Sequence, residues 1–194
     1  MRIIAGLGNP GKEYEATRHN AGRLSVEEFR KKNKLADWSF DKKINALTSQ
    51  GIIKKNKVFL VLPENFMNKS GLALKKIISS KKQAADLIVV HDDIDLPLGK
   101  FKISFGKNSG GHKGVDSIIK NIKTKDFVRI RIGIAPATAA GKTRKPKNDK
   151  HLDFLTKKFK PDEFQKIKQL SKKVSLALET IITNGLQKAM NKFN

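Results

Sequence analysis

Four short segments of the sequence carry the side chains best suited to chemistry. A histidine lies in TRHNAG, two amides and one aromatic ring in PENFMNKSG, a histidine followed by three carboxylates in DLIVVHDDIDLPLG, and a histidine beside a lysine in NSGGHKG. A neutral imidazole can take a proton from water, and a carboxylate can fix its tautomer. Because the chain has no cysteine and no GxSxG elbow, water is the expected nucleophile, with His19 as the candidate base.

The acidic run at residues 91–95 permits three interpretations. Carboxylates at this spacing suit Mg²⁺, as in a metal-dependent phosphoester hydrolase. Residues of a strand point alternately to opposite faces, so Asp92 and Asp93 would not easily share one ion. A single carboxylate directed at His19 is the simpler use, and a solvated acidic turn before LPLG is the structural alternative.

The segment NSGGHKG is typical of an anion-binding turn. Its glycines could leave N–H groups free to face a phosphate at the positive end of a helix, near His112 and Lys113. An ordinary glycine-rich loop would have the same composition.

A dinucleotide-binding loop is suggested by GLGNPG at residues 6–11, which matches the pattern GxGxxG after a short apolar run. Pro10, however, removes an N–H donor that a pyrophosphate would use. The expected acid about 20 residues on is also missing from a strand end, because Glu27 and Glu28 lie in a helical pattern. We therefore expect no dinucleotide, and a tight turn that positions Asn9.

These segments are positioned by a pattern of alternating strands and helices. Short apolar runs predict strands at 2–6, 44–53, 57–63, 86–92, 101–105 and 128–134. Helical spacing of apolar residues appears at 114–123 and again over 162–190, where Pro161 suits a first helical turn. The alternation predicts an α/β fold with a mixed, mostly parallel sheet covered on both faces.

The length of 194 residues favours a single domain over 1–194 that ends in a long helix over 161–191. The segment 137–150 has no large apolar residue and carries several lysines, which predicts a mobile basic loop. Since no apolar run approaches the roughly 18 residues of a membrane span, we expect a soluble, cytoplasmic protein.

Charge points to a polyanionic partner. Lys and Arg number 41 against 18 acids, a formal net charge of +23, which attracts nucleic acid over long range. A solubility adaptation or a lysine-rich genome would give the same balance, so charge alone does not name RNA.

Taken in order, five segments resemble the signatures of bacterial-type peptidyl-tRNA hydrolases. They are GLGNPGKEYEATRHNAG, ENFMNKSG, VVHDDIDLPLGKFK, GGHKG and FVRIRIGI, which together run from residue 2 to about residue 136. A weaker similarity continues in FLTKKF and the closing helix. The resemblance implies a monomeric, metal-free and cofactor-free enzyme with a three-layer α/β/α sandwich, which hydrolyses the ester between a peptide and the terminal ribose of tRNA.

The resemblance also implies roles for individual residues. His19 would be the general base that activates water, and Asp92 the carboxylate that holds its tautomer. The substrate-binding positions would be Asn9 and Asn68 around the peptide carbonyl and terminal nucleotide, Tyr14 and Phe66 near the tRNA end, Met67 in the pocket wall, His112 and Lys113 at the helix start, and Arg131 at the terminal phosphate.

One position departs from the family pattern, because GGHKG stands where the family has GGHNG. Lysine only donates hydrogen bonds, whereas the amide also accepts, so a water-orienting role cannot transfer unchanged to Lys113. Its ammonium could repel a protonated His19 or turn out to a phosphate. The family's lysine before the proline of the FMN segment is also replaced, by Leu62. A non-catalytic RNA-binding protein that lost its chemistry through Lys113 is therefore a rival hypothesis.

Overall fold

A computed structural model describes residues 1–136, 143 and 150–194 of the chain. Its strands form one seven-stranded sheet in the order β2-β3-β4-β1-β5-β7-β6. The strands are β1 (Arg2–Gly6), β2 (Ser39–Asp41), β3 (Ala46–Ile53), β4 (Asn56–Pro63), β5 (Leu87–Pro97), β6 (Phe101–Phe105) and β7 (Val128–Ala135).

The sheet is mixed, as expected, but it is parallel only at its centre. β4, β1, β5 and β7 run parallel to one another, whereas β2, β3 and β6 pair antiparallel with their neighbours. The sequence pattern missed the short edge strand β2, and β5 continues to Pro97 instead of ending near residue 92. Because β1 and β5 pair in parallel, the carboxyl end of β1 at Gly6 lies beside Val90 of β5.

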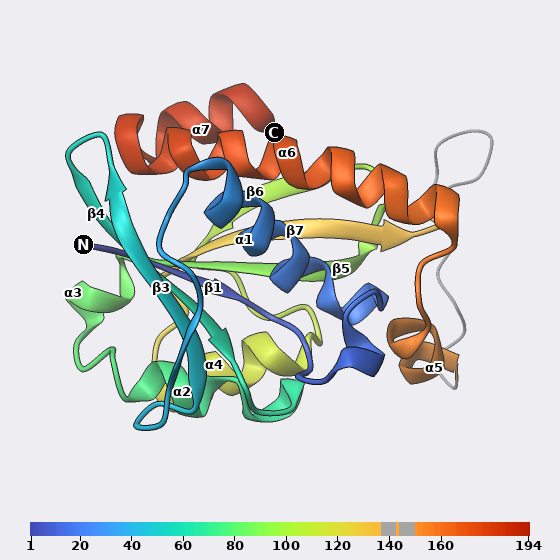
Figure 1. Ribbon diagram of the computed structural model, residues 1–194, viewed down its shortest axis with the longest axis horizontal. Helices are drawn as coiled ribbons and strands as arrows, with labels where there is room; N and C mark the ends of the chain where they lie inside the picture. Colours follow the sequence, from blue (N-terminus) through green and yellow to red (C-terminus); the bar gives the residue numbers. More distant parts are fainter. Residues whose placement is uncertain (137–142, 144–149) are drawn as a thin grey trace.

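Helices cover both faces of the sheet, which gives the expected three layers (Figure 1). One face carries α1 (Ala21–Lys32), α6 (Pro161–Asn184) and α7 (Leu186–Phe193), and the other carries α2 (Gly71–Lys75) and α4 (Lys113–Ile122). The short helix α3 (Lys81–Ala84) precedes β5, and α5 (His151–Thr156) lies at the end of the molecule toward which β5 and β7 point. The described residues also form the 3-10 turns η1 (Lys12–Tyr14), η2 (Arg18–Asn20) and η3 (Met67–Lys69).

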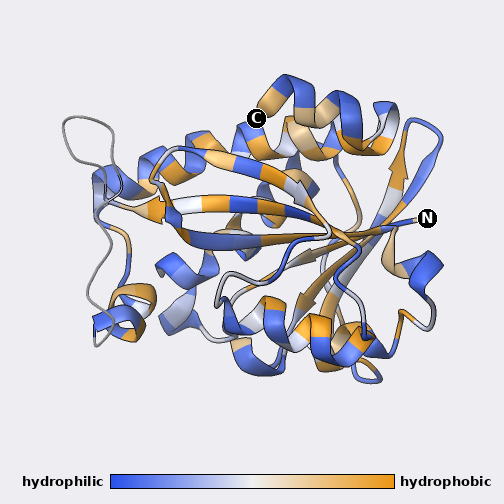
Figure 2. Cartoon of the chain, turned by 180° about the vertical axis from the view of Figure 1, so that it is seen from behind, coloured by the Kyte–Doolittle hydropathy of each residue, from blue (hydrophilic) through white to orange (hydrophobic). Residues whose placement is uncertain are grey.

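Alternation along the strands builds a core on each face. On β5, Ile88 and Val90 belong to the cluster under α1 and α6, while Leu87 and Val89 belong to the cluster under α2 and α4. Figure 2 shows the helices with apolar residues turned to the sheet and hydrophilic residues turned outward. Burial on both faces explains why the central strands are continuous apolar runs.

The predicted single helix over 161–191 is wrong, because the chain forms two helices there. α6 ends at Asn184, and Gly185 takes φ 90°, a left-handed conformation that favours glycine. α7 then begins at Leu186. The apolar spacing continued through the break, so periodicity alone did not reveal it.

The predicted basic loop at 137–150 lies outside the described residues, apart from Thr143 and Lys150. Among the residues that are described, no helix is both long enough and apolar enough to cross a membrane.

Candidate active site

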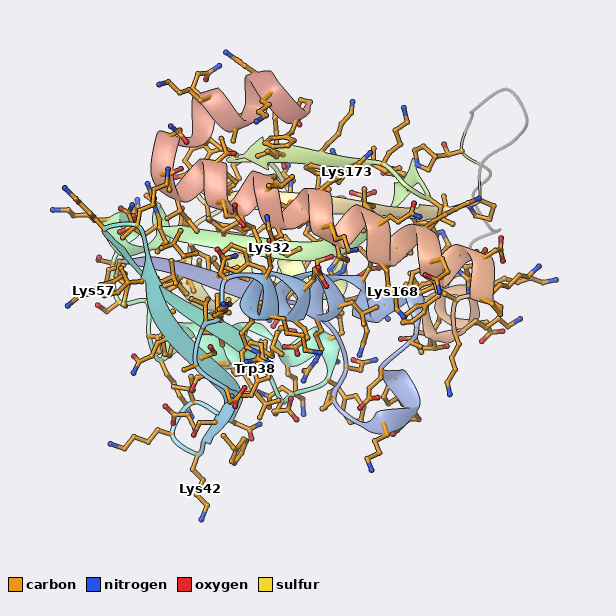
Figure 3. All side chains as sticks on the ribbon, turned by 45° about the horizontal axis from the view of Figure 1, so that its top comes forward. Lys32, Trp38, Lys42, Lys57, Lys168 and Lys173 are labelled. Atoms are coloured by element: carbon orange, nitrogen blue, oxygen red, sulfur yellow. The ribbon has the colours of Figure 1, made fainter. Side chains whose placement is uncertain are left out.

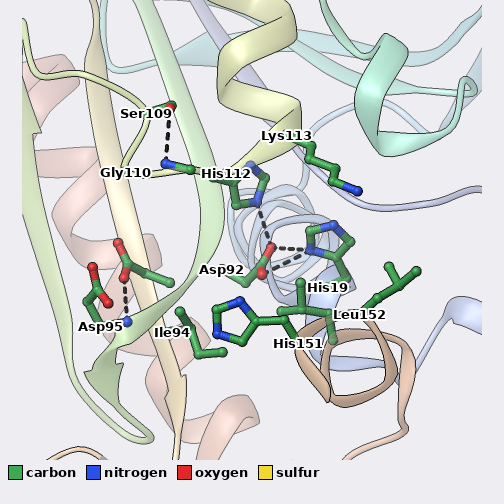
Figure 4. Close-up of a pocket in the computed structure, with 13 residues that line it drawn as sticks. His19, Asp92, Ile94, Asp95, Ser109, Gly110, His112, Lys113, His151 and Leu152 are labelled. Carbon is green, nitrogen blue, oxygen red and sulfur yellow. Dashed lines mark hydrogen bonds and ion pairs between the residues drawn. The ribbon is translucent and has the colours of Figure 1, made fainter. Parts of the chain in front are cut away.

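Three predicted site residues meet at the carboxyl edge of β1 and β5. His19 Nδ1 lies 2.9 Å from both carboxylate oxygens of Asp92, and His112 Nε2 lies 2.9 Å from Asp92 Oδ1. Each residue comes from a different element: His19 from η2, Asp92 from the middle of β5, and His112 from the residue before α4. Figure 4 shows the carboxylate between the two imidazoles.

The tautomers of both histidines follow from their partners. His112 Nδ1 accepts hydrogen bonds from the backbone N–H groups of Gly114 and Val115, at 3.1 and 3.2 Å. Its proton must therefore be on Nε2, which donates to Asp92. The Asp92 carboxylate likewise accepts a hydrogen bond from the Nδ1–H group of His19, which leaves the Nε2 of His19 as an acceptor.

Asp92 is held as a carboxylate. Burial alone would raise its pKa, but His19 and His112 outweigh burial and hold the pKa of Asp92 well below its usual range. Because the side chain of Asp92 is only 2% exposed, water does not weaken these contacts. The carboxylate therefore stays negative wherever the protein is folded near neutral pH.

His19, Asp92 and His112 also form a group whose ligand atoms lie within 4.8 Å of one another, which would suit a metal ion. Apart from His19 Nε2, the ligand atoms of the group are already engaged with one another, and the second nitrogen of His112 caps α4. A metal ion would have to displace these hydrogen bonds. Asp93 does not join the group, as expected from strand alternation, because it faces Arg131.

His91 is a fully buried neighbour of this group whose part sequence reasoning missed. Its Nδ1 donates to the backbone oxygen of Asp92 at 2.7 Å, and its ring meets that of His112 edge-on at 4.7 Å between centroids. Burial lowers the pKa of His91 well below its ordinary value, and the nearby His112 and Arg129 act in the same direction. His91 is therefore a neutral support beneath Asp92.

The amide of Asn9 is oriented by contacts on two sides. Its Oδ1 accepts from the backbone N–H of Met67 at 2.8 Å, while Asn20 bonds both the N–H and the carbonyl of Asn9. With Oδ1 engaged, the Nδ2 group of Asn9 is the end left to donate to a ligand. Asn20 follows His19 directly, so the turn that carries the imidazole also holds this amide.

The resemblance implied that Met67 forms part of the pocket wall, but Met67 does not line the cavity. Its side chain is 4% exposed and belongs to the core under α2 and α4. A Cβ added to Gly114 would lie 2.4 Å from its sulfur, so it packs against the start of α4. Its contribution to the site is the backbone N–H that orients Asn9.

Tyr14, Phe66 and Asn68 lie on the surface near that amide. The rings of Tyr14 and Phe66 meet edge-on at 6.5 Å between centroids, and Phe66 is 57% exposed. Asn68 is exposed in η3 and makes no hydrogen bond to another described residue. The exposed ring of Phe66 and the half-buried ring of Tyr14 form a surface on which a nucleobase could stack.

Arg131 reaches the site through an ion pair. Its Nε donates to Asp93 Oδ2 at 2.6 Å, and the side chain is 27% exposed. Arg131 therefore lies on β7 beside His91 of β5, where it contacts Asp93 and not Asp92.

The glycine-rich segment before α4 is not the anion-binding turn that the sequence suggested. His112 caps the helix, because its Nδ1 accepts hydrogen bonds from the N–H groups of Gly114 and Val115. These N–H groups are the donors that a phosphate would need. Lys113, the first residue of α4, is exposed, and its ammonium has no hydrogen bond or ion pair to a described residue. In Figure 4 its side chain extends on the same side as His19, away from Asp92.

A cavity of about 390 Å³ opens beside His19 and Asp92. Its wall is completed by α5, a helix that the sequence had not linked to the site. The lining residues are His19, Asp92, Asp93, Ile94, Asp95, Ser109, Gly110, Gly111, His112, Lys113, His151, Leu152 and Leu155. Asn9, Asn68, Tyr14, Phe66 and Arg131 lie outside this lining.

Arg18 fixes α5 against the turn that carries His19. Its guanidinium donates to the carbonyls of Lys157 and Lys158, pairs with Glu163 at 2.6 Å, and stacks over Phe154 at 4.5 Å. Sequence reasoning overlooked Arg18, although its place directly before His19 was a usable signal.

The opening segment GLGNPG joins β1 to η1 through irregular backbone that bends at Gly11, where the sequence predicted a tight turn. α1 begins only at Ala21, well beyond the glycines, so no helix N-terminus faces a pyrophosphate there. Gly22 lets α1 approach the strands closely, since a Cβ there would lie 2.2 Å from the carbonyl oxygen of Val90. This contact sets η2, which directly precedes α1, beside the middle of β5.

The chain is similar to peptidyl-tRNA hydrolases over its whole length. The family model "Peptidyl-tRNA hydrolase" matches residues 3–194. The peptidyl-tRNA hydrolase of Dehalococcoides mccartyi is 40% identical over 196 residues, covering 100% of both chains. That of Thermodesulfovibrio yellowstonii is 39% identical over 200 residues, covering 100% of this chain and 99% of the relative. The crystal structure of peptidyl-tRNA hydrolase from Acinetobacter baumannii superposes with a TM-score of 0.89 at 28% identity, covering 100% of this chain and 94% of that one.

Proposed function

Because this chain belongs to the peptidyl-tRNA hydrolase family and hydrolyses peptidyl-tRNA, we propose that His19 is the general base of the reaction. The observation that carries the proposal is the pair of 2.9 Å contacts between His19 Nδ1 and Asp92. They leave the Nε2 lone pair of His19 available to take a proton from a water molecule in the cavity.

The reaction then needs only a positioned water. The water oxygen attacks the ester carbon while His19 Nε2 accepts its proton, and the imidazolium formed is stabilised by the Asp92 carboxylate. Collapse of the tetrahedral intermediate releases the peptide as an acid, and the departing 3′-oxygen of the ribose takes the proton back from His19 Nε2, which regenerates the neutral base. His112 keeps the carboxylate in place through its own 2.9 Å hydrogen bond.

Asn9 supplies the donor for the developing oxyanion. Its amide is held with Oδ1 on the Met67 N–H, so Nδ2 is directed by the fold before substrate arrives. A neutral amide polarises the carbonyl without repelling the imidazolium.

The tRNA end lies on the exposed residues around the cavity. Tyr14 and Phe66 offer ring faces to the terminal base, Asn68 offers a free amide, and Arg131 offers a cation at the rim. Through its 2.9 Å hydrogen bond to Asp92, His112 supports the carboxylate and is not a direct substrate ligand.

Lys113 binds a backbone phosphate near the tRNA end. Its exposure and the lack of a described partner support this use. Replacement by Met should raise KM for peptidyl-tRNA, leave kcat within about threefold, and lower the slope of log KM against log salt by about 0.7 to 0.9. An unchanged salt slope would contradict this role, and Lys120→Met, on the exposed side of the same helix, is the control.

The base itself is tested by His19→Ala. Turnover of peptidyl-tRNA should be abolished while the Kd for tRNA changes little, because the imidazole acts on water and not on the tRNA backbone. Residual activity within tenfold of the wild type would reject the general-base role. Circular dichroism and melting temperature establish that the variant is folded.

We also propose that the enzyme acts as a monomer in the cytoplasm without a metal ion. The complete set of hydrogen bonds within the His19–Asp92–His112 group supports metal independence. Sedimentation at assay concentration and turnover that survives a chelator are the corresponding measurements.

A further inference from the structure

The side chain of Arg23 lies between the two chain segments that leave β1 and β4. The parallel pairing of these strands ends at Ala5 and Val61, so the ladder between them does not hold the segments that follow. Arg23, in the first turn of α1, bridges this gap. Its Nη1 donates to the carbonyl of Pro63 at 2.9 Å, and its Nη2 pairs with the carboxylate of Glu64. Neither the family resemblance nor the sequence pattern assigned Arg23 a role.

Gly8 leaves room for this side chain to cross the segment that leaves β1. A Cβ at Gly8 would lie 2.6 Å from Arg23 Cδ and 2.8 Å from Arg23 Cγ. The backbone N–H of Arg23 also donates to the carbonyl of Leu7 at 3.1 Å. The stem of Arg23 therefore packs on the segment that leads to Asn9, while its guanidinium holds the segment that leads to Met67.

These two segments meet again where the amide of Asn9 is oriented. Asn9 Oδ1 accepts from the N–H of Met67 at 2.8 Å, and no second hydrogen bond from a described residue reaches this amide. Asn20 fixes the backbone of Asn9 but does not bond its side chain. The direction of the amide therefore depends on the spacing between residues 7–9 and 63–67, which Arg23 spans.

The contacts of Arg23 are largely shielded from water. The side chains of Arg23 and Glu64 are 15% and 23% exposed, and Pro63 is buried. A buried carbonyl that loses its donor is costly, so without Arg23 this segment should shift until Pro63 finds another partner. Arg23 does not line the cavity, and we therefore expect any effect on catalysis to pass through Asn9.

We propose that Arg23 is a positioning residue, which holds the Asn9 amide in the direction of the developing oxyanion by fixing the start of the segment that carries Met67. This proposal rests on the assignment of Asn9 as the oxyanion donor above. It also gives the second glycine of GLGNPG a purpose, because Gly8 admits the Arg23 side chain.

Single-turnover cleavage of peptidyl-tRNA at saturating enzyme tests the proposal in two backgrounds. In the wild type, Arg23→Met should lower the rate about tenfold, because a displaced donor stabilises the oxyanion less. Asn9→Ala by itself should lose about 10²-fold, and adding Arg23→Met to it should change the rate less than about twofold. Arg30→Met is the control, because it removes a paired arginine of the same helix that does not contact this segment.

The Met67 N–H reports the positioning directly. In Arg23→Met, hydrogen exchange of this amide should become about tenfold faster, since its bond to Asn9 Oδ1 is weakened. In Arg30→Met the exchange of the same amide should stay within about twofold of the wild type.

Two results would overturn the role of Arg23: a rate for Arg23→Met within twofold of the wild type, or an equal loss in both backgrounds. Either result leaves Asn9 as the oxyanion donor, whereas an unchanged rate for Asn9→Ala would refute that donor and this proposal together. If Arg23→Met melts below the assay temperature, Arg23→Lys keeps the cation for Glu64 without the planar fork. Its loss should be about threefold and absent in Asn9→Ala, and a loss of the same size in both backgrounds would contradict the proposal.

Discussion

Asp92 accepts hydrogen bonds from two imidazoles, of which only His19 is free to change its tautomer. This difference decides how the site responds to substitution of Asp92. His112 cannot change tautomer, because Gly114 and Val115 both donate to its Nδ1. His19 has no second partner among the described residues, so its tautomer depends on Asp92 alone.

Asp92→Asn should therefore inactivate the enzyme while preserving its shape. The amide oxygen must turn to His112, which leaves the amide NH₂ facing His19 Nδ1 and moves the His19 proton to Nε2. A base without a free lone pair at Nε2 cannot activate water, and we expect kcat to fall by about 10² to 10⁴. Steady-state kinetics with the melting temperature measured alongside checks this. A loss of less than tenfold would mean that Asp92 does not set the tautomer.

At the scale of elements, the catalytic turn η2 is tied to α5 and α6 through one residue. Arg18 is 6% exposed and contacts Lys157, Lys158, Glu163 and Phe154 at once. These contacts add to the partial packing of Phe154 and Leu155 on the core, since the short α5 has no fully buried residue of its own.

Arg18→Met should release α5 and destabilise the fold. Removing one partner leaves Glu163 largely buried without its cation, which costs about 3 kcal/mol in the free energy of unfolding. Urea denaturation measures this loss, and hydrogen exchange should show faster exchange of the α5 amides. Arg2→Met is the matched control, because the Arg2–Asp86 pair is 34% and 43% exposed and should contribute at most about 1 kcal/mol. Equal losses for both variants would contradict the role of Arg18.

The periodicity of apolar residues was enough to predict the strands and helices that pack their apolar face on the core. The alternation in VRIRIGI and the apolar stripe of α4 predicted β7 and that helix, and the opposed directions of Asp92 and Asp93 followed from the strand period. The break at Gly185 depended on a backbone conformation that periodicity does not encode.

Within the site, sequence reasoning found His19, Asp92 and Asn9, but it could not find the side chains that arrive from distant segments. His151 is separated from His19 by more than 130 residues, and only the packing of α5 on η2 brings the two together. The cap that His112 makes on α4 likewise depends on the backbone geometry of the loop before it.

For the whole molecule, basic charge is distributed over several faces. Figure 3 shows labelled lysines extending from different elements: Lys32 from α1, Lys57 from β4, and Lys168 and Lys173 from α6. With a net charge of +23, such a surface attracts the polyanionic tRNA over long range.

Stability should fall as the pH falls below about 6.5, because of His91. Its pKa is lowered in the folded state, so between the ordinary pKa and the folded one the unfolded chain binds the extra proton. Protonation then favours unfolding, by about 1.4 kcal/mol per pH unit once the unfolded histidine is protonated. The free energy of unfolding, measured in urea from pH 7.5 to 5.0, should decrease for the wild type.

His91→Asn is the variant that isolates this effect. Asparagine can still donate to the carbonyl of Asp92 but does not titrate, so the decline below pH 6.5 should be clearly shallower. Asp92, whose pKa is also lowered, contributes only when the pH falls below about 4, outside this window. An identical decline in both proteins would show that His91 is not the group responsible.

In the proposed mechanism the His19 imidazole, held by Asp92, takes the proton from the attacking water. Single-turnover cleavage of peptidyl-tRNA by His19→Ala with added imidazole tests it most directly, at saturating enzyme so that binding does not limit the rate. We predict that cleavage is lost in His19→Ala and returns in proportion to the concentration of neutral imidazole. Cleavage by His19→Ala at a rate within tenfold of the wild type, without imidazole, would contradict the mechanism.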